Sequence, residues 1–436
     1  MELNKRTRLL QFGLVALGLV FAPVQAQVLA QGQVKAAAQA PAPAPAPAPA
    51  QAPAQTAAQA PAPAQAQAPA KPAVPTEILP LVGTSPTDII VGHVSGYTGP
   101  VASDAIEIGQ GGELYFDALN DRGGVDGRKV RLLRVDDNFK PDNTVKLIGE
   151  MKGKAVALLP TTGSANGAAL IKANVLEIPL VGTIPSPDLF RSPINKNIFH
   201  IRASDTQQTE KILEQLITVG MTNIGIFVPN NPFGEQATKQ VEAYLASRNL
   251  KLAVNAVYLL AGPKADVAPG LKALEGKTYQ ALIFFGPPKS VATGIAAVKK
   301  SGDTALLYAL SYADSKYIIE AAGLKLAHGV AISQVMPNLS TRTMPLVKAF
   351  HEDWSKYAKT KDAPTYFHIE GYIAARVIVE AIRKTKDASA DGVRRGLEQL
   401  RGFDLGGYIV DFSPTNHQGS KHVDLSVIGG SGKLVY

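Results

Sequence analysis

The sequence predicts an α/β protein built from two doubly wound, Rossmann-like lobes, and three observations lead to this prediction. From residue 88 onward, short and almost continuously apolar segments alternate with amphipathic segments of helical periodicity. This alternation occurs in two successive series, and 436 residues are more than one ordinary domain uses. Strands that are apolar on both faces are typical of parallel sheets with helices on either side.

The first series pairs each apolar strand with a following helix. Residues 88–94 form the first expected strand, and a Gly/Pro turn leads into a helix that ends near Asn120. Further strands are expected at 129–137, 155–160 and 178–183, with helices over 141–153 and from near Ala165 to Leu176. The second series starts after Ile201, with strands expected at 223–229, 251–259, 279–286 and 305–310, and helices at 209–220, 234–249, before 279 and at 290–302.

Two segments precede this body. Basic residues before an apolar stretch over 9–22 are typical of a secretory signal, and small residues that follow predict a signal peptide over 1–26, cleaved near Ala26. An uncleaved anchor helix and a later cut after Ala30 are the alternatives. Because the chain has no Cys to carry a lipid, we expect a free exported protein in the periplasm. Residues 27–76, almost entirely Ala, Pro and Gln, predict a disordered tether, either a solvated spacer or a segment that packs against the cell wall.

Composition excludes several classes of function. The absence of Cys rules out disulfide scaffolds, Cys-ligated metal sites and thiol nucleophiles. Outside the N-terminus, no apolar run approaches the roughly 18–20 residues that span a bilayer. The chain has 44 Lys and Arg against 36 Asp and Glu, and the body has no run of basic residues with interleaved aromatics. We therefore expect no nucleic-acid partner.

Motifs that could indicate catalysis or cofactor binding have better structural explanations. The glycines at 109–112 lie inside the first expected helix, where they permit close helix packing rather than phosphate binding. Residues 270–278 resemble a P-loop with the wrong glycine spacing and the wrong order of elements. The seven His show no metal-binding spacing, and the sequence has no G-x-S-x-G elbow. Asp136-Asp137 is best explained by turn formation after a strand. We expect no enzyme activity, no cofactor and no metal.

Residues 120–145 resemble the first lobe of type I periplasmic binding proteins, and the Leu/Ile/Val-binding proteins of the branched-chain amino-acid and amide ABC transporters are the most similar. The helix, Gly-Gly, strand, Asp-Asp and Pro-started helix of that family occur here in order, and 94–100, 230–235 and 284–288 fit in register. The resemblance covers residue 88 to the C-terminus. It implies lobe 1 over 77–203 and 336–421, lobe 2 over 204–335 and 422–436, three hinge crossings, and a ligand in the cleft between the lobes.

Open parallel sheets bind ligands beyond the carboxyl ends of their strands, so the loops that follow the strands hold the candidate site. In lobe 1 these loops are 95–98, 161–164 and 183–186, and in lobe 2 they are 230–233, 285–288 and 311–312. The family pattern adds a ring from lobe 2, at Phe233. The candidate ligand-binding residues are Tyr97, Thr98, Thr162, Gly163, Ser164, Thr183, Ile184, Phe233, Pro287, Ser311 and Tyr312.

The loop at 161–164 is the most informative, since free backbone N–H groups at the start of the next helix would favour a carboxylate. Ser164 could instead cap its own helix, and Phe233 and Tyr312 could serve packing alone. Amino-acid binders of the resembled family offer an acid after the strand at 305–310, where this chain has Ser311 with Asp314 three residues on, and Pro185 replaces a ligand-contacting Thr. A buried ammonium without a counter-charge costs several kcal/mol. An amine-free carboxylate therefore fits at least as well as an amino acid, unless Asp104 or Asp314 turns inward.

We expect a solute receptor that captures a small organic molecule and delivers it to an ABC permease in the inner membrane. The alternative is a periplasmic sensor that reports the same ligand to a signalling receptor. An enzyme on a Rossmann-like scaffold would need a nucleotide loop between a strand and a helix, and the sequence has none. Nothing in the sequence calls for more than a monomer.

Overall fold

The computed structural model describes residues 74–78, 87–184, 186–261 and 264–436. The expected signal peptide, the expected tether up to residue 73, and Pro185 lie outside the described residues. The short segment 74–78 contacts the body, where the Asp136 N–H donates to the Pro75 carbonyl at 2.8 Å and Ile78 packs against buried apolar side chains.

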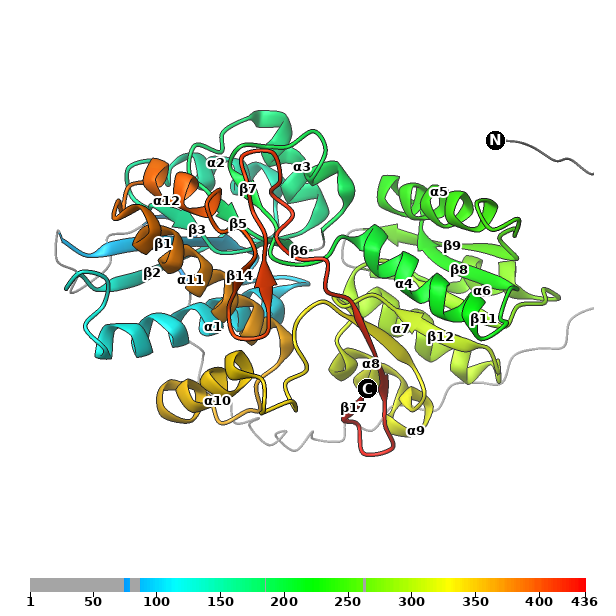
Figure 1. The fold of residues 1–436 in the computed structure, drawn as a ribbon. Helices are drawn as coiled ribbons and strands as arrows, with labels where there is room; N and C mark the ends of the chain where they lie inside the picture. Colours follow the sequence, from blue (N-terminus) through cyan, green and yellow to red (C-terminus); the bar gives the residue numbers. More distant parts are fainter. Residues whose placement is uncertain (1–73, 79–86, 185, 262–263) are drawn as a thin grey trace, which may run out of the picture. The chain divides into compact units, whose positions relative to one another are not determined.

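A first parallel sheet has the strand order β2-β1-β3-β5-β7, and it confirms the doubly wound arrangement expected for the first series (Figure 1). Nearly every residue of β1 is buried, which explains why its sequence is mostly apolar rather than alternating. Directly beyond β3 and β5, two further short strands, β4 and β6, pair in parallel and extend toward the candidate site. The strands are β1 (Ile89–Ser95), β2 (Val130–Asp136), β3 (Ala157–Leu158), β4 (Thr161–Thr162), β5 (Leu180–Val181), β6 (Thr183–Ile184) and β7 (Ile198–Phe199).

Helices cover both faces of this sheet. On one face α1, α10, α11 and α12 pack together, and on the other α2 packs with α3 (Figure 1). The glycines expected to allow close packing do so, because a Cβ at Gly111 would lie 1.9 Å from the His368 carbonyl oxygen of α11. The helices are α1 (Ala102–Asp121), α2 (Pro141–Gly149), α3 (Ser164–Ala173), the 3₁₀ turn η1 (Asp188–Phe190), α10 (Pro345–Tyr357), α11 (Tyr366–Thr385) and α12 (Ala390–Leu397).

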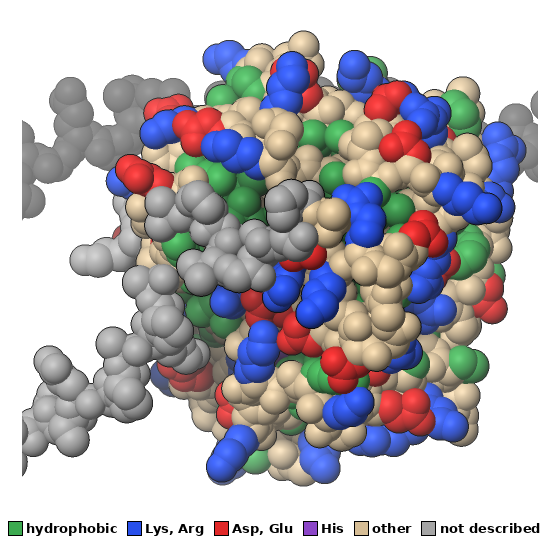
Figure 2. Space-filling model, turned by 90° about the vertical axis from the view of Figure 1, so that its left-hand side faces the viewer, with side chains coloured by type: hydrophobic (Ala, Val, Ile, Leu, Met, Phe, Trp, Pro, Cys, Tyr) green, Lys and Arg blue, Asp and Glu red, His purple; other side chains and the backbone are tan. Residues whose placement is uncertain are grey.

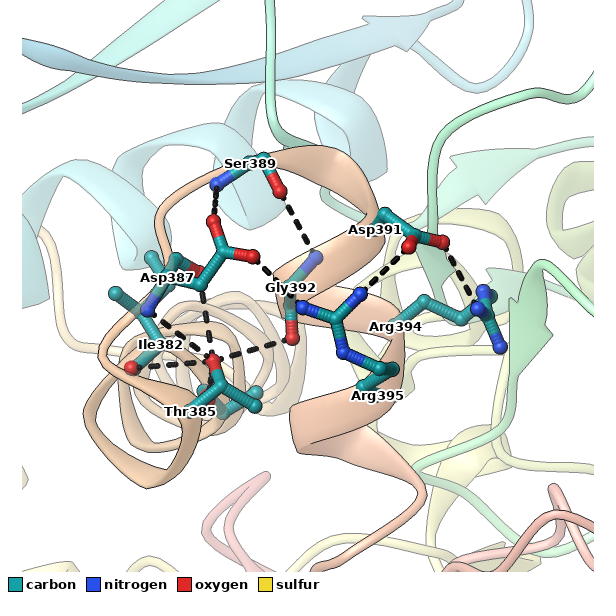
Figure 3. Close-up of polar contacts among 9 residues, drawn as sticks. Ile382, Thr385, Asp387, Ser389, Asp391, Gly392, Arg394 and Arg395 are labelled. Carbon is teal, nitrogen blue, oxygen red and sulfur yellow. Dashed lines mark hydrogen bonds and ion pairs between the residues drawn. The ribbon is translucent and has the colours of Figure 1, made fainter.

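The connection from α11 to α12 is held by polar contacts (Figure 3). The Ser389 hydroxyl caps α12 by accepting the Gly392 N–H at 3.0 Å. Arg395 pairs with Asp387 and Asp391 at 2.8 and 2.6 Å. A Cβ at Gly392 would lie 2.3 Å from the Asp387 carboxyl carbon, so only glycine fits at this point of the turn.

A second, larger sheet has the order β10-β9-β8-β11-β12-β13-β16-β17, with parallel pairing from β9 to β13 and antiparallel strands at both edges. Helices α4 and α5 cover one face, and α6, α7 and α8 cover the other (Figure 1). The strands are β8 (Ile224–Pro229), β9 (Val254–Ala261), β10 (Lys264–Asp266), β11 (Ala281–Phe284), β12 (Leu306–Ala309), β13 (Ala331–Gln334), β16 (Asp424–Ile428) and β17 (Leu434–Val435). The helices are α4 (Asp205–Thr218), α5 (Pro232–Ala246), α6 (Ala268–Leu274), α7 (Pro288–Lys300), α8 (Ser315–Ala322) and α9 (Leu324–Ala327).

We call the first sheet with its helices the first lobe and the second sheet with its helices the second lobe. The chain passes between them three times, because α10 to α12 and the hairpin of β14 (Phe403–Asp404) and β15 (Ile409–Val410) return to the first lobe before β16 joins the second. Tyr408, in that hairpin, ties two of the crossing segments together by donating to the Ile201 and Val335 carbonyls at 2.6 and 3.0 Å.

Basic and acidic side chains are interspersed on the face shown in Figure 2, without a continuous patch of either sign. Within the part of the chain that the structure describes, no helix is long and apolar enough to cross a bilayer. In the same residues, no three His, Asp or Glu side chains come together as they would around a metal ion.

Candidate functional site

A cavity of about 220 Å³ lies where the carboxyl ends of both sheets meet, and both lobes line it. Its volume is below the roughly 300–1,000 Å³ typical of pockets for drug-sized ligands, so its guest is small. Most of the lining is apolar, with a few polar groups between. The lining residues are Pro100, Val101, Asp104, Phe139, Thr162, Gly163, Ser164, Ala165 and Ile184 from the first lobe, and Asn231, Phe233, Leu260, Gly286, Pro287, Pro288, Lys289, Ser290 and Tyr312 from the second.

The start of α3 forms the polar end of the cavity in the first lobe. Gly163 makes the turn from β4 into the helix with a φ of +98°, and its N–H donates to the Ile184 carbonyl at 2.7 Å. Ser164 is the first residue of α3, and no side chain of the described residues caps this helix. The alternative that Ser164 caps its own helix is therefore wrong. The first backbone N–H groups of α3 and the positive end of its dipole remain available to an anionic ligand.

Thr162, next to this turn, is held in place by the strand beside it. Its hydroxyl lies 2.8 Å from the Ser95 hydroxyl and accepts the Gly96 N–H at 3.4 Å. Since Thr162 already has these partners, its hydroxyl is positioned before a ligand arrives. The hydroxyl of Ser164 has no partner among the described residues and is the freer of the two.

The second lobe contributes Phe233, Pro287 and Tyr312, as expected from the strand ends. Phe233 lies in the first turn of α5 and is partly buried, while Pro287 precedes α7. Tyr312 is 3% exposed, and its hydroxyl finds no hydrogen-bond acceptor among the described residues. The Gly286 backbone amide faces this oxygen and favours its ionised form, but burial dominates and holds the pKa of Tyr312 well above its usual value. The neutral phenol therefore has a proton to donate, and a ligand is the natural acceptor.

Four of the expected site residues do not line the cavity, because other groups hold them. Tyr97 is buried against His93, with its hydroxyl 2.6 Å from the imidazole Nδ1. Thr98 is exposed and accepts from Asn138 at 3.0 Å. The hydroxyls of Thr183 and Ser311 face Ser186, at 3.5 Å, and Arg202, at 2.5 Å. Through these contacts, each of the four residues supports neighbouring backbone or side chains.

Asp104 is the acidic side chain that turns inward. It lies in the first turn of α1, is 2% exposed, and accepts the Tyr317 hydroxyl of the second lobe at 3.0 Å. Burial raises its pKa to about 7, and the hydrogen bond from Tyr317 opposes this shift. Asp314, the other candidate, instead caps α8 by accepting the Lys316 N–H at 2.9 Å. The cavity thus has a carboxyl group that can be charged or neutral near physiological pH.

Beside Asp104, a second contact joins the lobes. The Lys316 ammonium of α8 lies 2.5 Å from a Glu107 carboxylate oxygen of α1 and donates to the Ser103 hydroxyl at 2.9 Å. The α1–α8 contacts hold the two lobes together along one side of the cavity.

Phe139 is a ring that the strand-end rule missed. It follows Asp136-Asp137, and its N–H donates to the Asp137 carboxylate at 2.8 Å, which fixes a left-handed φ of +56°. The Asp pair therefore does form a turn, as expected. Phe139 packs so closely on the glycine turn that a Cβ at Gly163 would lie 2.7 Å from the ring. The left-handed backbone after the Asp pair turns the ring to the cavity. Apart from those two carboxylates, nothing in the sequence predicts that Phe139 lines the cavity.

Comparison with known proteins places these features in context. The family model described as periplasmic binding protein matches residues 88–433. A Leu/Ile/Val-binding protein homolog 7 from Brucella suis is 23% identical over 383 residues, 81% of this chain and 93% of that protein. A Leu/Ile/Val-binding protein homolog 3 from Brucella melitensis is 29% identical over 133 residues, which span only 36% of that relative. The crystal structure of an extracellular ligand-binding receptor from Verminephrobacter eiseniae superposes with a TM-score of 0.75 at 28% identity, over 80% of this chain and all of that one.

Proposed function

Because the chain belongs to the periplasmic binding protein family, we propose that it is an exported receptor that binds a small organic carboxylate between its two lobes and delivers it to an ABC permease. The family is one of solute-binding proteins rather than enzymes. The observation that carries the ligand class is the uncapped N-terminus of α3, which opens into a cavity shared by both lobes.

The contacts around the cavity support a carboxylate. At α3, the first backbone N–H groups, the helix dipole and the free Ser164 hydroxyl would all favour a negative charge. Apolar side chains, Phe139 and Ile184 in the first lobe and Phe233 in the second, would enclose the body of the ligand. A ligand held by both lobes binds the closed form better than the open form, and this difference is the signal that a permease can read.

The charge state of Asp104 should determine whether the cavity favours a ligand with an amine or one without. The absence of an acid at Ser311 argued against an ammonium group, but Asp104 supplies a carboxyl from the opposite lobe. Relatives named for binding Leu, Ile and Val agree with this possibility. An amino acid would pair its ammonium with ionised Asp104, whereas an amine-free acid would leave Asp104 protonated.

A thermal-shift screen of the purified protein tests the ligand class. The panel pairs each amino acid with the amine-free acid of the same skeleton and adds aromatic carboxylates and amides. A ligand at about 100 times its dissociation constant should add roughly 2.7 kcal/mol of stability. Hits among carboxylates, absent for the corresponding primary amides, support the proposal. A response to neutral amides alone, with no carboxylate bound, would contradict it.

Delivery to a permease needs a cellular experiment. Deleting the chromosomal copy should abolish uptake of the radiolabelled ligand at low concentration, and a plasmid copy should restore it. Normal uptake in the deletion strain, together with loss of a transcriptional response to the ligand, would instead favour a sensor.

A further inference from the structure

The helices α1, α3, α5 and α7 each place N-terminal residues in the wall of the cavity, but their positive ends are not equally compensated. α5 is capped by the Asn231 side chain, which accepts the Gly234 N–H at 3.1 Å, and α1 has Asp104 in its first turn. Neither α3 nor α7 has a side-chain cap or an acidic residue in its first turn. One uncompensated helix end thus faces the cavity from each lobe.

α7 also carries a lysine where a helix disfavours positive charge. Lys289 is the second residue of α7, beside the positive end of the helix dipole, where a cation is destabilising. Lys289 lines the cavity, is exposed, and forms no ion pair with a carboxylate of the described residues. Pro288 has no N–H, so the backbone donors of this first turn are those of Lys289 and Ser290.

A third donor lies on the same side of the cavity. Tyr312 is nine-tenths buried or more, lines the cavity, and has a hydroxyl proton without an acceptor. Gly286, the residue before Pro287 at the start of α7, faces that hydroxyl. Among the residues that the structure describes, the second lobe therefore lines the cavity with Lys289, the start of α7 and the phenol of Tyr312, and with no carboxylate to pair with them.

We propose that the ligand is a small dicarboxylate, with one carboxylate at the start of α3 and the second bound in the second lobe by Lys289, the start of α7 and Tyr312. This inference rests on the proposed carboxylate-binding function and adds the second anionic group. Such a ligand would neutralise an uncompensated helix end in each lobe and bridge the two, so closure of the cleft would depend on both charges. Asp104 would then stay protonated and could donate to the ligand.

Calorimetry with matched acids tests the second carboxylate. The pairs share a carbon skeleton and differ in one carboxylate, which a methyl group replaces: adipate with hexanoate, terephthalate with p-toluate, and glutamate with norvaline. We expect at least one diacid to bind roughly 10-fold or more tightly than its monoacid, as expected for one added charge-assisted contact. Lys289→Met should remove most of that preference, while Lys300→Met, a matched change at the other end of α7, should leave it intact.

The possible outcomes distinguish the dicarboxylate proposal from the carboxylate-binding function on which it rests. Diacid preference that Lys289→Met abolishes supports it. Monoacids that bind as tightly as their diacids, or a preference that survives Lys289→Met, would overturn the second carboxylate and leave a carboxylate receptor standing. Failure of every acid to bind, while neutral amides bind, would overturn the carboxylate-binding function itself. Because Lys289 is exposed, its variant should fold, and thermal unfolding without ligand checks this.

Discussion

Replacing Tyr312 by Phe should change stability and binding in opposite directions. The substitution removes only the hydroxyl, and the ring stays in a cluster of buried residues from β8, β11, α4 and α5. A buried hydroxyl without an acceptor costs about 1–3 kcal/mol, and the lost contact with the Gly286 amide offsets part of this, so Tyr312→Phe should stabilise the ligand-free protein by about 1 kcal/mol. For a chain of this size, that corresponds to a rise in Tm of roughly 1–2 °C. If the hydroxyl donates to a ligand carboxylate, the variant loses a bond worth about 1.5–3 kcal/mol, or roughly 10- to 150-fold in affinity.

Calorimetry with the tightest ligand and thermal unfolding of the ligand-free protein measure the two effects. Tyr308→Phe is the matched control, because Tyr308 lies on β12 in the same cluster but does not line the cavity. That variant should leave affinity unchanged. A Tyr312→Phe protein that binds as tightly as the wild type would show that the hydroxyl does not reach the ligand. A lower Tm would show that the contact between the hydroxyl and the Gly286 amide outweighs the cost of the missing acceptor.

Three further predictions concern the first lobe. Asp104 has a folded pKa of about 7 against an ordinary value of 3.8, so its contribution to stability is present below pH 4 and is lost as the pH rises to 7. Asp104→Asn should flatten the pH dependence of the unfolding free energy in that window, by a few kcal/mol. Unfolding in urea at pH 4 to 8 measures this free energy for the variant and the wild type. Parallel stability curves for the two proteins would argue against a buried carboxyl. Ser164→Ala should weaken carboxylate binding by about 1–3 kcal/mol with little change in Tm, since Ser164 caps no helix, and unchanged affinity by calorimetry would remove Ser164 from the site. Gly163→Ala should destabilise the fold by about 1–3 kcal/mol, because φ is +98° and the new methyl meets Phe139; an unchanged Tm would show that the turn can relax.

The sequence predicted the fold well because each strand was recognisable on its own. The residues of β8 are apolar throughout and those of β1 are mostly apolar, and the structure buries nearly all of them within parallel sheets. Helix boundaries were less accurate: α4 begins at Asp205, where Ser204 and Gln207 form a capping box, rather than at residue 209. The hydrophobic period starts only after the polar first turn, so it places the start of this helix too late.

The strand-end rule located part of the cavity and failed where a side chain found a better partner. It identified Thr162, Gly163, Ser164, Ile184, Phe233, Pro287 and Tyr312, which line the cavity. Ser311 follows β12 more closely than Tyr312 does, yet its hydroxyl turns to Arg202, whose guanidinium is buried with Glu370. Arg202 and Glu370 lie far apart in the chain, so no local sequence pattern predicts that they pair. The position of a strand end therefore predicts which loop lines the cavity. The contacts of each side chain with its neighbours determine which residues of that loop do so.

Asp104 and Asp314 are a second case in which the sequence could not predict the direction of a side chain, and here the direction bears on function. Asp314 and Asp104 were equal on the sequence, since each could have turned toward the cleft. Asp314 precedes a helix, and local hydrogen bonding to the Lys316 N–H settles its orientation. Asp104 lies within the first turn of α1, where it cannot act as the N-cap, and its partner is the Tyr317 hydroxyl, 213 residues away on the other lobe. Because Asp104 lines the cavity and also bonds across the cleft, its protonation should affect ligand charge preference and lobe contact together.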